Sequence, residues 1–155
     1  MGSTKVTRAL LWAAVTVTAV ACGDLSRDNP VDPKVSGGLS LRDQLLGSWS
    51  RDDAEKNEIY TFKVDGSIEL RDFTNPSGGT VDRNATYPDT RVRIFEGTFQ
   101  LVGDLLSITF TRAQSNEPGE TLQVPVATKK AEIGISRNTL TLDETDGRRF
   151  YTRLP

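Results

Sequence analysis

Short runs in which apolar and polar residues alternate, separated by turn-forming residues, fill the chain from residue 47 onward. Alternation with a period of two places the apolar side chains on one face of a β-strand. Because most of these runs follow one another through tight turns, the predicted sheet is an antiparallel meander. Eight or nine strands are expected, at residues 47–52, 58–64, 67–73, 91–102, 105–112, 121–127, 131–136, 139–143 and 148–153.

The apolar face of this sheet needs a cover, and the sequence offers only one short helix for it. Ser40 and Asp43 have the spacing of a helix-capping pair, and Leu41 and Leu45 would share one helical face. Closing the sheet on itself buries the apolar face and removes the exposed edges. The predicted fold is therefore all-β: a small antiparallel up-and-down β-barrel of about eight strands with a short N-terminal helix. The interior of such a barrel is just wide enough for side chains or one small ligand.

Three local features refine this prediction. The pair Asp65-Gly66 predicts a type I′ hairpin turn, in which both central residues have positive φ. The apolar face changes parity at Ile94-Phe95, which predicts a β-bulge there. Pro125 lies within the predicted strand 121–127, which makes that strand an edge or a bulged one.

The beginning of the chain predicts export. Lys5 and Arg8 precede a 13-residue apolar segment, residues 9–21, and no acidic residue accompanies them. That segment is shorter than the roughly 20 residues of a membrane-spanning helix. A basic start, a short apolar core and a small-residue end are typical of a cleaved signal peptide, here residues 1–21.

The sequence Ala19-Val20-Ala21-Cys22 resembles the lipobox of bacterial lipoproteins, with Ala19 where Leu is usual. The resemblance implies cleavage before Cys22, diacylation of its sulfur and acylation of its new amine. An ordinary secretory signal beside a chance cysteine is the alternative. Cys22 is the only cysteine, and lipidation would leave the exported chain no free thiol to form intermolecular disulfides.

Residues 22–38 are rich in Pro, Gly, Asp, Asn and Ser, and they predict a flexible lipidated tether. Packing of this segment as an edge strand is the alternative. Residues 39–155 form the predicted barrel domain. The expected location is the bacterial cell envelope, with acyl chains on Cys22 in the membrane. Gly23 in place of an Asp favours the outer membrane if the organism has one.

Charge and composition exclude several classes of function. Without residues 1–21, 19 − 2 = 17 basic residues face 21 acidic ones, which gives no basic footprint for nucleic acid. The chain has no histidine, so Ser-His-Asp and Cys-His catalysis and Cys/His zinc sites are not expected. The acidic groups at 52–55 and 143–146 leave a calcium site or a carboxylate-only glycosidase formally open. The prediction is a non-enzymatic protein with no metal and no cofactor.

The segment Leu46-Gly47-Ser48-Trp49, a Gly-x-Trp at the start of the first strand after a short helix, resembles lipocalins and lipocalin-like domains of bacterial lipoproteins. The likeness extends over about residues 41–155. It includes the segments at 60–67, 97–99, 103–108, 138–142 and 150–153. The resemblance implies that Trp49 plugs the closed end of the barrel and that Arg153 stacks over it. The alternatives are an ordinary core tryptophan and a solvated arginine.

The leading functional hypothesis is a lipocalin-like domain that binds a small hydrophobic ligand. The aromatic residues expected to point inward are Tyr60, Phe62, Phe99 and Phe110, which would either line a cavity or fill it as core. A second hypothesis is a protein-binding barrel, an inhibitor or a component of an envelope complex, that acts through the loop 74–90 with its Tyr87. A structural spacer is the third.

Overall fold

The computed structural model describes residues 39–155. The predicted signal peptide (1–21), Cys22 and the tether (22–38) lie outside the described residues. In the described part of the chain, no helix combines the length and the apolar character that crossing a membrane requires.

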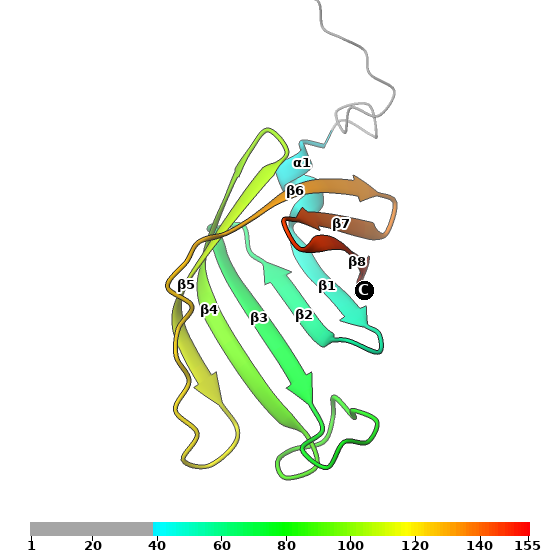
Figure 1. Cartoon of the computed structure of the whole chain (residues 1–155). Coiled ribbons are helices and arrows are strands. Elements are labelled where there is room, and N and C mark those ends of the chain that lie inside the picture. Colours follow the sequence, from blue (N-terminus) through cyan, green and yellow to red (C-terminus); the bar gives the residue numbers. More distant parts are fainter. Residues whose placement is uncertain (1–38) are drawn as a thin grey trace, which may run out of the picture.

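The described residues form one short helix followed by a closed barrel of eight antiparallel strands, as the sequence predicts (Figure 1). Each strand pairs with the next along the chain, and the first strand pairs with the last. The elements are α1 (Leu41–Leu45), β1 (Gly47–Asp52), β2 (Asn57–Phe62), β3 (Ser67–Thr74), β4 (Arg91–Val102), β5 (Leu105–Ser115), β6 (Lys129–Ser136), β7 (Thr139–Glu144) and β8 (Gly147–Arg153).

Helix α1 begins with the predicted capping pair. The backbone N–H of Asp43 donates to Ser40 Oγ at 3.1 Å, and the Ser40 N–H donates to Asp43 Oδ2 at 3.3 Å. These two bonds satisfy backbone donors that the first helical turn leaves free. Leu45, the last residue of the helix, is fully buried and packs against the barrel core at one end.

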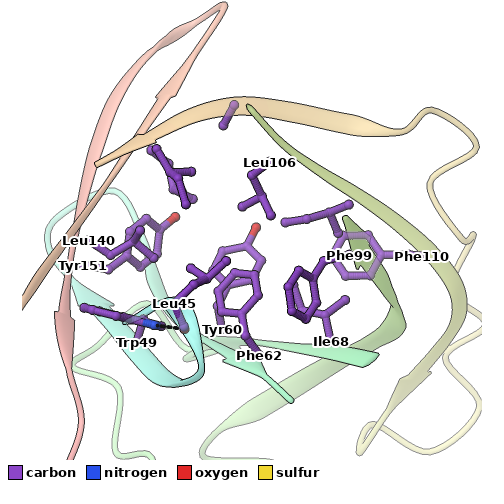
Figure 2. Packing of buried hydrophobic residues seen from close by; sticks show 14 residues of the cluster. Leu45, Trp49, Tyr60, Phe62, Ile68, Phe99, Leu106, Phe110, Leu140 and Tyr151 are labelled. Carbon is purple, nitrogen blue, oxygen red and sulfur yellow. Dashed lines mark hydrogen bonds between the residues drawn. The ribbon is translucent and has the colours of Figure 1, made fainter. Parts of the chain in front are cut away.

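The barrel interior is filled by alternate side chains from all eight strands (Figure 2). On β2, for example, Tyr60 and Phe62 are buried while the intervening Thr61 is not. The rings of Phe62 and Phe99 meet edge to face, with centroids 5.1 Å apart. The buried cluster consists of Leu45, Trp49, Tyr60, Phe62, Ile68, Phe99, Leu106, Ile108, Phe110, Ala131, Ile133, Leu140, Leu142 and Tyr151.

The bulge lies elsewhere than predicted. Strands β3 and β4 pair in one register along their length, so the face of β4 does not switch at Ile94-Phe95. The irregularity is between β4 and β5, where Glu96 pairs with Arg112 but Gly97 pairs with Phe110, leaving one extra residue on β5. The alternation of apolar residues predicts the wrong position for the bulge because Ile94 is apolar but lies half-buried on the outer face of β4. Apolar character alone therefore does not identify the inner face of a strand.

Two further local predictions are wrong. Residues 121–127 form no strand; Pro125 lacks the N–H that a ladder needs. At Asp65-Gly66 only Gly66 has a positive φ, 85°. Because β2 ends at Phe62, the connection is longer than a type I′ turn, and a bond from Gly66 N–H to Lys63 O closes it at 3.0 Å. A glycine in the left-handed region ends this longer type of hairpin loop.

The two ends of the barrel differ. Helix α1 lies at one end, and the loop 75–90 lies at the other (Figure 1). The second long connection, 116–128, begins at that other end and runs back along β5 to β6 (Figure 1). Strands β5 and β6 pair only over Leu105–Ile108 of β5, so the rest of β5 extends beyond Lys129, the first residue of β6. The end that carries the loop 75–90 is called the mouth below.

Candidate functional site

The end of the barrel that carries α1, called the closed end below, is built around Trp49 and Arg153. The Arg153 guanidinium carbon lies 4.2 Å from the centroid of the Trp49 ring. Arg153 also donates to the carbonyl oxygens of Leu46, at 2.9 Å, and Gln44. Trp49 Nε1–H donates to Leu45 O at 2.7 Å. One tryptophan and one arginine thus join β1, β8 and the end of α1.

Phe62 and Phe99, two of the four predicted ligand-binding aromatics, also belong to this end. Both are buried, and the Arg42 guanidinium of α1 covers the Phe99 ring with its carbon 5.0 Å from the centroid. Neither residue lines the cavity described next. They act as core, which is the alternative that the sequence left open.

A cavity of about 570 Å³ opens at the mouth, and Tyr60 and Phe110 line it. Its apolar wall is completed by Leu70, Phe95, Pro125 and Ala127. The segment that was expected to be a strand therefore contributes to the cavity as an irregular connection. The charged members of the lining are Arg51, Glu55, Lys56, Glu58, Asp72, Lys129, Glu144, Asp146 and Arg149.

Lys129 connects the aromatic and the charged parts of the lining. Its Nζ donates to the Tyr60 hydroxyl oxygen at 2.9 Å and pairs with Glu144 Oε1 at 2.8 Å. Burial opposes the lysine charge, but Tyr60 and Glu144 outweigh it, so the pKa of Lys129 is raised. For Tyr60, in contrast, burial is itself the main reason that the pKa is raised. Both groups therefore keep their protons at neutral pH.

Two arginines of the cavity lining are held by acidic neighbours. Arg149 pairs with Glu144 and, at 2.6 Å, with Asp146. Arg51 pairs with Glu55 at 2.8 Å and with Asp53. The bond from Arg51 is the main reason that the pKa of Asp53 is lowered.

Glu58 differs from these acids. Its side chain lies inside the barrel at 6% exposure, and Tyr151 Oη donates to its Oε1 at 2.7 Å. Among residues 39–155, no lysine or arginine nitrogen lies within 4.0 Å of this carboxylate. Burial, followed by the charge effects of Tyr60 and Glu58, raises the pKa of Tyr151.

Asp72 lies directly opposite Glu58 on the neighbouring strand β3. Lys56 Nζ lies 3.2 Å from Asp72 Oδ2. The other oxygen, Oδ1, is buried and accepts no hydrogen bond from any residue that the structure describes. Arg93 is the register partner of Asp72 on β4, but its guanidinium pairs with Glu120.

The sequence reasoning missed the charged inner residues of the mouth. Each of them lies two positions from an inward-pointing apolar residue of the same strand and therefore also points inward. The pairs are Glu58 with Tyr60, Glu144 with Leu142 and Lys129 with Ala131. Counting every second residue along each strand, whether apolar or polar, would have found them. The face on which a side chain lies depends on its position along the strand and not on its polarity.

The acidic groups weighed as calcium or catalytic sites serve other purposes. Asp53 Oδ1 accepts from the backbone N–H groups of Glu55 and Lys56, which shapes the β1–β2 turn. Asp143 pairs with Arg148. Across residues 39–155, no three acidic, cysteine or histidine side chains come together as a metal-ion site would require.

The loop 74–90 is anchored to the barrel. Arg83 donates to Ser50 Oγ at 2.8 Å, Asn57 Oδ1 at 2.5 Å and Arg51 O at 3.0 Å. Tyr87 is 37% exposed on this loop, and its hydroxyl lies 3.5 Å from Glu117 Oε1 in the other long connection.

In comparisons with known proteins, no family model, no curated protein and no solved structure matches the chain.

Proposed function

We propose that the protein is a membrane-anchored envelope lipoprotein, not an enzyme, whose lipocalin-like barrel binds a small ligand with a hydrophobic part. The observation that carries the proposal is the cavity of about 570 Å³ at the mouth. Cavities of roughly 300–1,000 Å³ suit small molecules. Leu70, Phe95 and Phe110 offer the ligand an apolar wall, while Phe62 and Phe99 stabilise the barrel.

Native mass spectrometry of the full chain, extracted from membranes in a mild detergent, tests ligand binding. A small molecule that stays bound, and that Leu70→Trp displaces, is the expected result, because the larger ring would occupy the cavity. Val102→Trp is the matched control, since Val102 is 75% exposed. Absence of a bound species, together with no thermal shift across a panel of fatty acids and other hydrophobic compounds, would count against the proposal.

Anchoring has its own test. In a bacterial host, the mature chain should carry the mass of two or three acyl chains and sediment with membranes. Cys22→Ser should lose both properties, because the acyl chains attach to that sulfur and to the amine of the same residue. A Cys22→Ser chain that stays membrane-bound would contradict the lipoprotein proposal.

A second candidate is a protein-binding role for the loop 74–90. The bonds of Arg83 favour it, because they hold the loop in one shape, and a fixed loop loses less conformational entropy when it binds. Pull-down of envelope proteins with the full chain and with Tyr87→Ala tests this role. Identical sets of partners would exclude Tyr87 from recognition.

A further inference from the structure

We infer that the cavity at the mouth selects ligands that carry a protonated amine, held between Glu58 and Asp72, beside an apolar body. The inference rests on the proposed ligand-binding function and specifies the chemistry of the ligand. Three features of the mouth support it: its charge balance, the position of two carboxylates, and the apolar wall next to them.

The charge balance leaves one carboxylate without a counter-ion. The lining contains five acidic and four basic side chains. Each of the four cations, Arg51, Lys56, Lys129 and Arg149, has an acidic partner within 4.0 Å. Glu58 has none among the described residues, although it is 94% buried, at 6% exposure. A buried carboxylate without a counter-ion is costly, and a cationic ligand would remove that cost.

The position of Asp72 gives the amine a second acceptor. Glu58 and Asp72 are register partners on β2 and β3, and such pairs on one face have Cβ atoms about 4.5–5.5 Å apart. Two like charges in this arrangement repel each other. Asp72 Oδ1 is buried without a hydrogen-bond donor from the described residues. One ammonium group has three N–H donors and can reach both carboxylates.

The apolar wall begins immediately beside these acids. Leu70 is two residues before Asp72 and therefore faces the same side of β3. Its register partner on β4 is Phe95, whose ring lies 5.8 Å from that of Phe110, centroid to centroid. A ligand with its amine at the acids would rest its body on this wall. An amine on an aromatic or alkyl body, an aralkylamine, fits this arrangement.

The arrangement suits an amine better than a metal ion. Calcium takes six to eight oxygen ligands. Among the described carboxylates that line the cavity, only Glu58 and Asp72 are register partners, and Tyr151 and Lys56 already occupy one oxygen of each. An ammonium group needs fewer acceptors.

Isothermal titration of the full chain in a non-ionic detergent tests the inference with three probes of similar shape: 2-phenylethylamine, 2-phenylethanol and 3-phenylpropionate. We expect the amine to bind at least about tenfold more tightly than the alcohol, and the carboxylate to bind most weakly. Glu58→Gln should abolish this preference, and Asp72→Asn should reduce it. Glu96→Gln, on the outer face of β4, is the matched control and should leave it unchanged.

The outcomes separate the inference from the function on which it rests. Equal binding of amine and alcohol would overturn the amine site and leave the ligand-binding barrel in place. A preference that survives in Glu58→Gln would also overturn it. Binding of none of the probes, with no ligand retained in native mass spectrometry, would remove both. Glu58→Gln keeps an oxygen for the Tyr151 hydroxyl, and thermal melting of each variant establishes that it is folded.

Discussion

Arg153 and Trp49 are register partners across the seam where β8 meets β1, and the arginine guanidinium carbon lies over the tryptophan ring, 4.2 Å from its centroid. The same guanidinium binds two carbonyl oxygens at the end of α1. One side chain therefore seals the closed end and holds the helix on it.

Replacement of Arg153 by Met should lower the free energy of unfolding by about 2–4 kcal/mol, because two charged hydrogen bonds and the cation–π contact are lost. Urea unfolding of the full chain, followed by tryptophan fluorescence, measures it. Arg112→Met is the control, since the Arg112 side chain is 69% exposed on the outer face. Equal losses in both variants would show that Arg153 contributes nothing special at the seam.

Gly97→Ala should destabilise the barrel by about 3 kcal/mol or more, through overpacking. A Cβ at this position would lie 2.0 Å from Thr109 O and 2.7 Å from Phe110 Cα, both backbone atoms beside the bulge. Gly134→Ala is the matched control because its Cβ would meet nothing within 4 Å. Thermal unfolding compares the two variants. A Gly97→Ala chain as stable as the control would mean that β5 moves aside at little cost.

Stability should fall in alkali through Tyr60 and Tyr151. Burial raises the pKa of both phenols in the folded chain, whereas in the unfolded chain they titrate near pH 10. Their contribution is complete below pH 10 and declines as the pH rises beyond it, since only the unfolded chain then releases these protons. Urea midpoints between pH 8 and 11 measure the decline. Tyr60→Phe should make it shallower, and an unchanged slope would contradict the assignment.

Arg83→Ala should release the loop 74–90 while leaving the barrel folded. The substitution removes three hydrogen bonds to β1 and β2, but Arg83 lies outside the barrel core. Hydrogen exchange should accelerate in residues 75–90 and stay unchanged in β6 and β7. Arg112→Ala serves as the control. Equal exchange of the loop in the variant and the native chain would show that other contacts fix it.

The sequence predicts most of the strands because alternation and turn residues are local signals. It also pairs Trp49 with Arg153, through a resemblance. The position of the bulge and the absence of a strand at residues 121–127 depend on how β5 pairs with β4 and β6. This pairing cannot be predicted from the local sequence pattern. Glu58, Lys129 and Glu144 were missed because polar residues were assigned to the outside, whereas a barrel open at one end allows charged side chains within it.

The seam between β1 and β8 also has a consequence for how the chain folds. Seven of the eight strand pairings join neighbours in sequence and can form by successive hairpins. The eighth joins Trp49 of β1 to Arg153 of β8, which are 153 − 49 = 104 positions apart. Among the strand pairings of residues 39–155, this one joins the most distant segments and therefore has the greatest entropic cost of closure. Closure of the ring is therefore the step on which the folding rate should depend most.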